Sequence, residues 1–168
     1  MKPSFFTHMI TTFCYVGHLR PAPGTWGSFA ALLVGYGLHM IGGPALLMIG
    51  IVASFTLGLW ATILETRGQD NHDPSEIVID EVAGQWIAML PVSIGAAHAG
   101  ASIGALWPGL VAAFALFRLF DIWKPSLVGW ADRRDDALGV MLDDVIAGVF
   151  AAIVVCVLAF LSHGVFRL

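Results

Sequence analysis

Long apolar stretches alternate with short charged segments along this chain. No Asp, Glu, Lys or Arg occurs between Arg20 and Glu65, between Glu81 and Arg118, or between Asp144 and Arg167. A membrane-spanning helix needs about 20 apolar residues, so these stretches have room for about two, two and one crossings. Gly42-Gly43-Pro44 and the Gly- and Ser-rich segment 99–104 divide the first two stretches. The pattern predicts spanning helices at Trp26–Ile41, Pro44–Leu64, Val82–His98, Ala105–Phe117 and Val145–Leu161.

The expected fold class is therefore all-α, a polytopic membrane helix bundle with four to five spanning helices. The count stays open because the first and fourth stretches are short, and Pro91 is expected to kink the third. Near the N-terminus, apolar residues follow helical spacing and predict either an amphipathic helix on the membrane surface or a buried packing helix. These residues are Phe5, Phe6, Met9, Ile10 and Phe13.

The composition agrees with a membrane protein. The 168 residues are 58 % hydrophobic and 12 % charged, and the mean hydropathy is +0.82, whereas a soluble domain carries about 25 % charged residues. A chain of this length suits a single domain over residues 1–168. The net charge of −4 argues against nucleic acid as a partner, because a phosphate backbone requires a basic surface.

Charged residues concentrate on one side of the predicted bundle. The expected turns near Gly42 and Gly100 carry no charge, and the other connections carry nearly all of it. With five crossings, Arg167 falls on the uncharged side. The positive-inside rule places the remaining basic residues in the cytoplasm: Lys2, Arg20, Arg67, Arg118, Lys124, Arg133 and Arg134.

Two acidic segments run directly into predicted spanning helices. One is Asp80-Glu81-Val82-Ala83-Gly84, and the other is Asp143-Asp144-Val145-Ile146-Ala147-Gly148. In each, a glycine follows a pair of carboxylates about one turn deeper, and glycine lets membrane helices approach closely. If the two glycines face each other, the acidic pairs meet at one end of the bundle. Glu76 precedes Asp80 by four residues, so in a helix both would share a face.

Carboxylates gathered at a low-dielectric boundary repel one another, and a divalent cation removes that repulsion. Oxygen ligands without a Cys or His cluster favour Mg²⁺ or Mn²⁺ over zinc. The alternative is that these acids are helix-start charges stabilised by the helix dipole. A third acidic group fits a solvated loop better, because it is interspersed with arginines: Asp132, Asp135 and Asp136.

Two further segments carry groups suited to phosphate. In the Pro/Gly-rich loop Gly17–Ser28, Arg20 adds a positive charge and Thr25 can cap the following helix, whose free N–H groups attract anions. In Phe117–Pro125, three charged residues are spaced three apart, so they share one helical face: Arg118, Asp121 and Lys124. They form either a phosphate clamp or snorkelling cations with a local counter-ion.

Four blocks together resemble the phosphatidylglycerophosphatase A family, in the family's order. They are Arg20–Ser28, Asp70–Gln85, Phe117–Pro125 and Gly139–Gly148. The resemblance implies a Mg²⁺-dependent lipid phosphatase of the bacterial inner membrane, with an active site facing the cytoplasm. Its substrate would be phosphatidylglycerophosphate, a membrane phospholipid, and its products phosphatidylglycerol and inorganic phosphate.

The resemblance and the residue chemistry together assign the candidate roles. The expected catalytic residues are Asp80, Glu81, Asp143 and Asp144, and the expected metal ligands are Glu76, Asp80, Asp121 and Asp144. Arg20, Thr25, Arg118 and Lys124 are expected to bind the substrate phosphate. The nucleophile is either a metal-bound water or a carboxylate such as Glu81 or Asp143. Two other functions stay open: another metal-dependent lipid-headgroup phosphotransferase and a small divalent-cation transporter.

Overall fold

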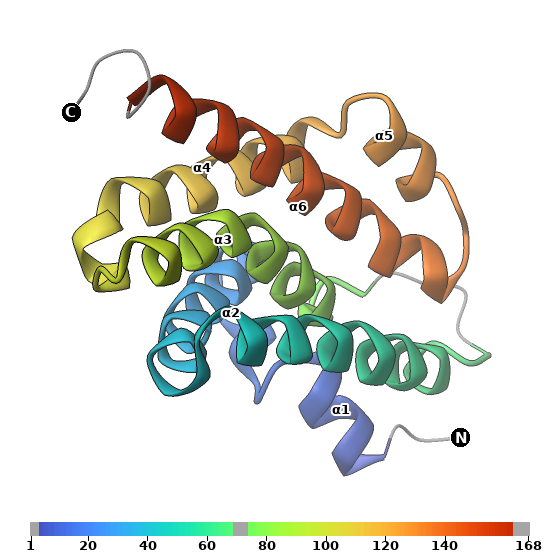
Figure 1. Cartoon of the computed structure of the whole chain (residues 1–168). Helices are drawn as coiled ribbons and strands as arrows, with labels where there is room; N and C mark the ends of the chain where they lie inside the picture. Colours follow the sequence, from blue (N-terminus) through green and yellow to red (C-terminus); the bar gives the residue numbers. More distant parts are fainter. Residues whose placement is uncertain (1–3, 69–73, 163–168) are drawn as a thin grey trace.

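The computed structural model describes residues 4–68 and 74–162, and within them every regular element is helical (Figure 1). Lys2, Arg167 and segment 70–73 of the acidic block lie outside the described residues. The α-helices are α1 (Phe5–Thr11), α2 (Pro23–Glu65), α3 (Ile79–Ala99), α4 (Trp107–Trp123), α5 (Leu127–Asp132) and α6 (Ala137–Phe160). Two 3₁₀ turns, η1 (Val16–His18) and η2 (Ile103–Leu106), precede α2 and α4.

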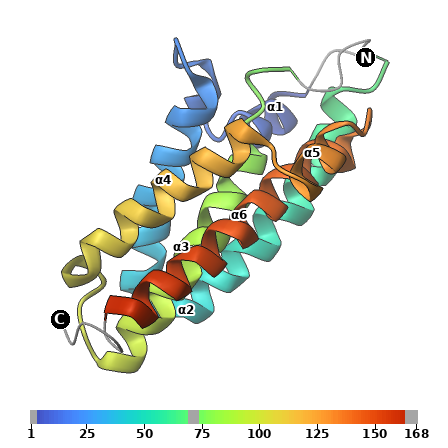
Figure 2. The same ribbon diagram turned by 90° about the horizontal axis from the view of Figure 1, so that it is seen from above.

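α2 consists of two arms separated by a break. Gly42 and Gly43 leave helical geometry, and Gly43 adopts a positive φ of 60° that glycine accepts without strain. The first arm (23–41) and the second arm (44–65) run in different directions (Figure 2). They pack together where Gly50 of the second arm lies against Leu38 of the first. The break predicted at Gly42-Gly43-Pro44 is confirmed.

α3 is the central helix, and buried residues occur along its whole length. It remains helical through Pro91. The Trp86 ring lies between the two arms of α2, against Gly35 and Gly50, and its indole N–H donates a 2.7 Å hydrogen bond to the Ala31 carbonyl. Among the described residues, three stretches are long and apolar enough to cross a membrane: Pro23–Glu65, Ile103–Trp123 and Ala137–Phe160.

α3 and α6 touch backbone to backbone at Gly84 and Gly148. A Cβ on Gly148 would lie 2.9 Å from the Gly84 Cα and closer still to its carbonyl oxygen. A Cβ on Gly84 would collide with the Asp144 carbonyl and the Phe117 ring of α4. The two glycines face each other, which is the condition under which the two acidic pairs were expected to meet. Their contact joins α3, α4 and α6 at one level of the bundle.

The helical segments alternate in direction, so one end of the bundle collects the charge. At the uncharged end, the His39 imidazole forms a 2.7 Å hydrogen bond with the Ser93 hydroxyl, and Gly104 lies against the Tyr36 hydroxyl. At the opposite end lie the start of α2, the start of α3, the end of α4, α5 and the start of α6 (Figure 2). The described Asp, Glu, Lys and Arg residues belong to these segments, to their connections and, for Glu65, to the end of α2.

α6 begins earlier than the sequence predicts. It starts at Ala137 instead of Val145, because the Asp136 side chain caps it by accepting a 2.7 Å hydrogen bond from the Gly139 N–H. Asp143 and Asp144 therefore lie inside the helix and not at its end. The interpretation of these two residues as helix-start charges is wrong for α6. Asp80 and Glu81 do lie in the first turn of α3, so for these two residues the position at a helix start is confirmed.

The connection between α4 and α6 also differs from a simple solvated loop. It contains α5, which the pattern did not predict, and Asp132 at the end of α5 pairs with Lys124. Arg134 pairs with the capping Asp136 at 2.7 Å. α4 itself continues past Phe117 to Trp123, so its last turns carry Arg118 and Asp121.

The N-terminal segment packs against the charged end of the bundle. α1 buries Thr7 and Thr11, while Phe5 and Phe6 are exposed. The Thr11 carbonyl accepts a 2.8 Å hydrogen bond from the N–H of Val78, the residue before α3. These contacts place α1 directly behind the start of α3.

Two histidines fasten this N-terminal segment to α2. One ring nitrogen of His8 bonds the Glu65 carboxylate at 2.7 Å, and the other bonds His18 at 3.0 Å. Glu65 ends α2, and His18 ends η1. The histidines therefore join α1, the end of α2 and the segment that leads into the start of α2.

The glycine contact generates the first prediction. Gly148→Ala forces α3 and α6 apart, and overpacking of this kind costs about 1–3 kcal/mol. We expect a lower melting temperature in detergent, measured by circular dichroism. Gly95→Ala on α3 is the matched control, because its Cβ meets nothing within 4 Å. A Gly148→Ala protein that melts at or above the wild-type temperature would contradict this account of the contact.

Candidate active site

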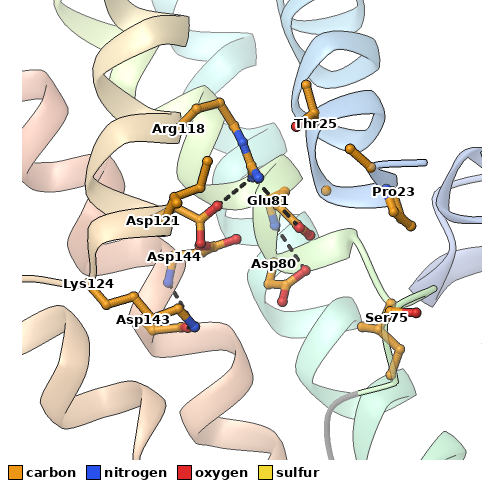
Figure 3. A pocket seen from close by; sticks show the side chains of 14 residues that line it. Pro23, Thr25, Ser75, Asp80, Glu81, Arg118, Asp121, Lys124, Asp143 and Asp144 are labelled. Carbon is orange, nitrogen blue, oxygen red and sulfur yellow. Dashed lines mark hydrogen bonds and ion pairs between the residues drawn. The ribbon is translucent and has the colours of Figure 1, made fainter. Parts of the chain in front are cut away.

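A pocket of about 350 Å³ opens at the charged end of the bundle (Figure 3). Its walls come from five parts of the chain that are distant in sequence. They are the start of α2, the connection before α3, the first turn of α3, the end of α4 with Lys124, and the early part of α6. The lining residues are Ala22, Pro23, Gly24, Thr25, Ser75, Ile77, Asp80, Glu81, Arg118, Asp121, Ile122, Lys124, Asp143 and Asp144.

Three carboxylates meet at the floor of this pocket. Each of Asp80, Glu81 and Asp144 offers an oxygen, and these oxygens lie within 4.8 Å of one another. Asp80 and Asp144 are only 7 % and 2 % exposed. In the described part of the chain, Glu81 Oε2 and Asp144 Oδ1 have no hydrogen-bond partner. Acidic oxygens are therefore buried together and left unsatisfied.

Arg118 borders the carboxylates on one side. Its Nη1 lies 2.5 Å from Asp121 Oδ2 and 3.9 Å from Glu81 Oε1. The same nitrogen donates a 3.3 Å hydrogen bond to the Ser28 hydroxyl of α2. The predicted i,i+3 pairing of Arg118 and Asp121 is confirmed. The guanidinium thus lies between α4, α3 and α2, as Figure 3 shows for its labelled neighbours.

Lys124 borders the carboxylates on the other side, although it is not on the α4 face that the spacing predicts. It follows the helix in a left-handed conformation with φ 50°, which redirects its side chain. Its ammonium lies 3.1 Å from Asp143 and pairs also with Asp132. Burial disfavours the charged form, but these two carboxylates outweigh that effect and raise the pKa of Lys124 above its usual value. Lys124 therefore stays charged beside Asp143.

The start of α2 forms the wall opposite α4. Pro23 occupies the first turn of the helix, and Gly24 approaches Glu81 and Arg118 so closely that a Cβ there would lie 3.2 Å from Arg118 Nη1. The first N–H groups of a helix lack intrahelical partners and carry partial positive charge. Thr25 lines the same wall. This wall supplies positive potential without a formal charge.

These groups are suited to a hard divalent cation with an attached anion. Three buried carboxylates repel one another strongly in a low-dielectric site. Oxygen ligands of this kind are those that Mg²⁺ and Mn²⁺ take, commonly through a few carboxylates plus substrate phosphate oxygens. The unsatisfied oxygens of Glu81 and Asp144 therefore fit such an ion. Arg118, Lys124 and the start of α2 surround the space that its anionic ligand would occupy.

The structure brings most of the predicted site residues together. Asp80, Glu81, Asp143, Asp144, Asp121, Thr25, Arg118 and Lys124 all line the pocket. Glu76 and Arg20 do not. Glu76 lies in a turn before α3, which begins only at Ile79, so the expectation that it shares a helical face with Asp80 is wrong. Arg20 reaches the rim indirectly, through a 3.4 Å hydrogen bond to Ser75.

Three residues make contacts at the site that the sequence does not predict. Ser75 lines the pocket, Ser28 accepts a hydrogen bond from Arg118, and Asp132 shares Lys124 with Asp143. Ser28 and Asp132 lie beside the pocket and outside its lining. Tertiary contacts alone bring these three residues to the site, so spacing in the sequence gives no signal for them.

The phosphatidylglycerophosphatase A family model matches residues 9–159 of this chain. The chain belongs to this family. The matched region contains every residue that lines the pocket. The family is one of phosphatases, so the chain is a member of a hydrolase family.

Curated relatives agree with the family assignment. A Haemophilus influenzae phosphatidylglycerophosphatase A is 36 % identical over 150 residues, covering 88 % of this chain and 85 % of the relative. The Escherichia coli phosphatidylglycerophosphatase A is 29 % identical and covers 84 % of this chain and 74 % of the relative. A Bacteroides thetaiotaomicron protein provisionally named phosphatidylinositol-3-phosphatase is 36 % identical over 160 residues, covering 93 % of this chain and 95 % of the relative. No solved structure matches the chain.

The carboxylate cluster generates a second prediction, independent of catalysis. In buffer with chelator, Asp144→Asn removes one of three buried like charges and should raise the melting temperature by roughly 5 °C. Asp80→Asn should act in the same direction. Asp135→Asn, in the exposed connection before α6, is the control and should leave the melting temperature unchanged. If both pocket variants melt below wild type in chelator, the three carboxylates do not repel as described.

Proposed function

We propose that this protein hydrolyses the phosphomonoester of phosphatidylglycerophosphate, giving phosphatidylglycerol and inorganic phosphate, in a Mg²⁺-dependent reaction. The observation that carries the proposal is the convergence of Asp80, Glu81 and Asp144 beside Arg118, at one end of an apolar helical bundle. The family and the names of the relatives support the substrate. A lipid phosphate needs this combination, because its acyl chains require a bilayer and its headgroup requires cations.

Asp80, Glu81 and Asp144 would hold the Mg²⁺ ion, with Asp121 beside them in the same pocket. When bound, Mg²⁺ polarises phosphoryl oxygens and acidifies a bound water. Glu81 and Asp143 border the pocket and each lie near one cation, Arg118 and Lys124 respectively. They are therefore the proposed groups for accepting the proton of an attacking water or for attacking phosphorus directly.

Arg118, Lys124 and the start of α2 are proposed to bind the phosphoryl oxygens. In phosphoryl transfer most of the catalytic effect comes from positioning the group and stabilising its charge. Arg118 presents a planar fork of donors, and Thr25 with the free N–H groups of α2 faces the same space. Arg20 would contribute long-range positive potential from the rim through its contact with Ser75.

The proposed location is the bacterial inner membrane, with the pocket facing the cytoplasm. Both arms of α2, α3, α4 and α6 would give five crossings, with α1 and α5 at the cytoplasmic surface. The basic residues beside the pocket support this orientation by the positive-inside rule. The transporter alternative is disfavoured, because a transport site requires acids near the bilayer midplane, and the acids that the structure describes lie at one end of the bundle.

The Bacteroides relative suggests a second candidate substrate, phosphatidylinositol-3-phosphate. Its name refers to removal of a phosphate from an inositol lipid, and it is 36 % identical over 160 residues. The carboxylates and cations of the pocket suit any lipid phosphomonoester equally well. The two substrates differ in the alcohol that carries the phosphate, glycerol in one and inositol in the other. A competition assay with both lipids therefore decides which headgroup the pocket prefers.

The third prediction tests the reaction. Purified protein in detergent should release inorganic phosphate from phosphatidylglycerophosphate with Mg²⁺ and not with chelator. Asp80→Asn and Asp144→Asn should each lower kcat/KM at least about 100-fold, because each removes a proposed metal ligand. Phosphatidylinositol-3-phosphate added as a competitor should slow the hydrolysis of phosphatidylglycerophosphate, because the pocket offers the same carboxylates and cations to both phosphomonoesters.

Asp135→Asn is again the control and should retain wild-type activity, because Asp135 is exposed and outside the pocket. Circular dichroism of each variant verifies the fold. The absence of phosphate release with Mg²⁺, Mn²⁺ or any other divalent ion would refute the proposed reaction. Preferred hydrolysis of the inositol lipid would instead move the assignment to the second substrate.

A further inference from the structure

The walls of the pocket are not equally closed, and the difference shows where a lipid substrate fits. Two walls are sealed by close contacts at small residues. Between α3 and α6, Gly84 and Gly148 touch through their backbones. Between α2 and the start of α3, Gly27 lies against Val78, where a Cβ would be 2.8 Å from the valine Cβ. No acyl chain fits between helices at such distances.

The wall between α4 and α6 is also closed. Lys124, at the end of α4, bonds Asp143 of α6 at 3.1 Å. Deeper in the bundle, the rings of Phe120 and Phe150 pack edge to face with centroids 5.8 Å apart. α5 lies against α6 beyond this wall (Figure 1). A lipid on this side would have to displace a partly buried ion pair and an aromatic contact.

The start of α2 and the end of α4 also contact each other. Arg118 lies against Gly24 and reaches Ser28 at 3.3 Å, and the rings of Phe29 and Phe114 pack edge to face with centroids 6.3 Å apart. This side differs from the other walls because Ile122, which lines the pocket, is also exposed on the outer surface of α4. In Figure 2 the two helices draw apart toward the pocket end. In Figure 3 the labelled residues Arg118 and Thr25 face each other across this space. We call this region, bordered by Trp26 and Phe29 of α2 and by Leu119 and Ile122 of α4, the α2–α4 opening.

Apolar side chains surround the α2–α4 opening on its outer face. Trp26 and Phe29 of α2 are 43 % and 44 % exposed, and Leu119 and Ile122 of α4 are 51 % and 71 % exposed. Ile122 lines the pocket as well, so this apolar surface is continuous with the site that holds the carboxylates. The remaining rim is polar, because Ser75 is exposed and bonded to Arg20.

We infer that the α2–α4 opening holds the diacylglycerol end of the substrate, which reaches the pocket sideways from the bilayer between these two helices. This inference rests on the proposed function and adds the route and binding surface of the acyl chains. The headgroup phosphate lies between Arg118 and the start of α2, and the chains extend over Trp26, Phe29, Leu119 and Ile122. The polar rim at Ser75 faces water, and inorganic phosphate leaves the pocket past it.

The test maps where the acyl chains lie without requiring turnover. Wild-type protein is incubated, in Mg²⁺, with a non-hydrolysable phosphonate analogue of phosphatidylglycerophosphate that carries a photoreactive diazirine in one acyl chain. After irradiation, mass spectrometry locates the adducts. A parallel sample contains an excess of the deacylated headgroup, which competes for the phosphate pocket but has no chains. Adducts that the headgroup suppresses mark chains attached to a bound phosphate.

We expect the suppressed adducts on the four residues of the α2–α4 opening. Adducts on the outer face of α6, at the exposed residues Ile153 and Val157, should come from bulk lipid and persist with competitor. Suppressed adducts on α5 or α6, or none at the opening, would overturn the inference.

A matched pair of variants adds a functional readout. Leu119→Glu places a charge on the apolar surface of the opening, outside the pocket lining. It should raise KM for the diacyl lipid about tenfold, while hydrolysis of the deacylated headgroup stays near wild type. Ile153→Glu carries the same change on the outer face of α6 and should leave KM unchanged. Equal loss on both substrates in Leu119→Glu would contradict the inference.

The two proposals fail in different ways. If phosphatidylglycerophosphate with Mg²⁺ yields no phosphate but the suppressed adducts of the analogue lie at the opening, the reaction is wrong and the binding surface stands. If phosphate is released and the suppressed adducts lie elsewhere, the reaction stands and the route is wrong.

Discussion

The site depends on the backbone contact between Gly84 and Gly148. Each glycine lies about one turn from a carboxylate pair, so the contact fixes the separation of Asp80-Glu81 from Asp143-Asp144. A larger residue at either position would separate α3 from α6 and widen the carboxylate cluster. That contact imposes the energetic cost of burying these like charges, and the proposed cation would offset this cost. The packing of α3 against α6 therefore also determines the spacing of the carboxylates in the site.

The remaining architecture follows from placing this contact at one end of an apolar bundle. Helices that alternate in direction return each charged connection to the same end, where the cations Arg118 and Lys124 border the carboxylates. The N-terminal segment supports this end from behind through the hydrogen bond between Thr11 and Val78. The result is a polar pocket directly adjoining an apolar surface, an arrangement suited to molecules that have a charged head and a hydrocarbon tail.

Much of this arrangement could be predicted from the sequence, because apolar runs, the Gly42-Gly43-Pro44 break and the two acid–glycine segments are local signals. What failed depended on tertiary contacts or on backbone conformation. The start of α3 is set by contact with α1, which leaves Glu76 outside the helix. The start of α6 is set by the Asp136 cap, and the left-handed conformation of Lys124 redirects its side chain to Asp132 and Asp143. Four-residue spacing alone carries none of this information.

The central claim is that the two acidic segments form a single cation site. Its most direct test is anomalous diffraction from crystals of this protein soaked in Mn²⁺, which replaces Mg²⁺ at oxygen sites and scatters anomalously. The account predicts an anomalous peak within bonding distance of carboxylate oxygens from Asp80 or Glu81 on α3 and from Asp144 on α6. A peak bound by only one of these helices, or no peak among the three residues at saturating Mn²⁺, would contradict it.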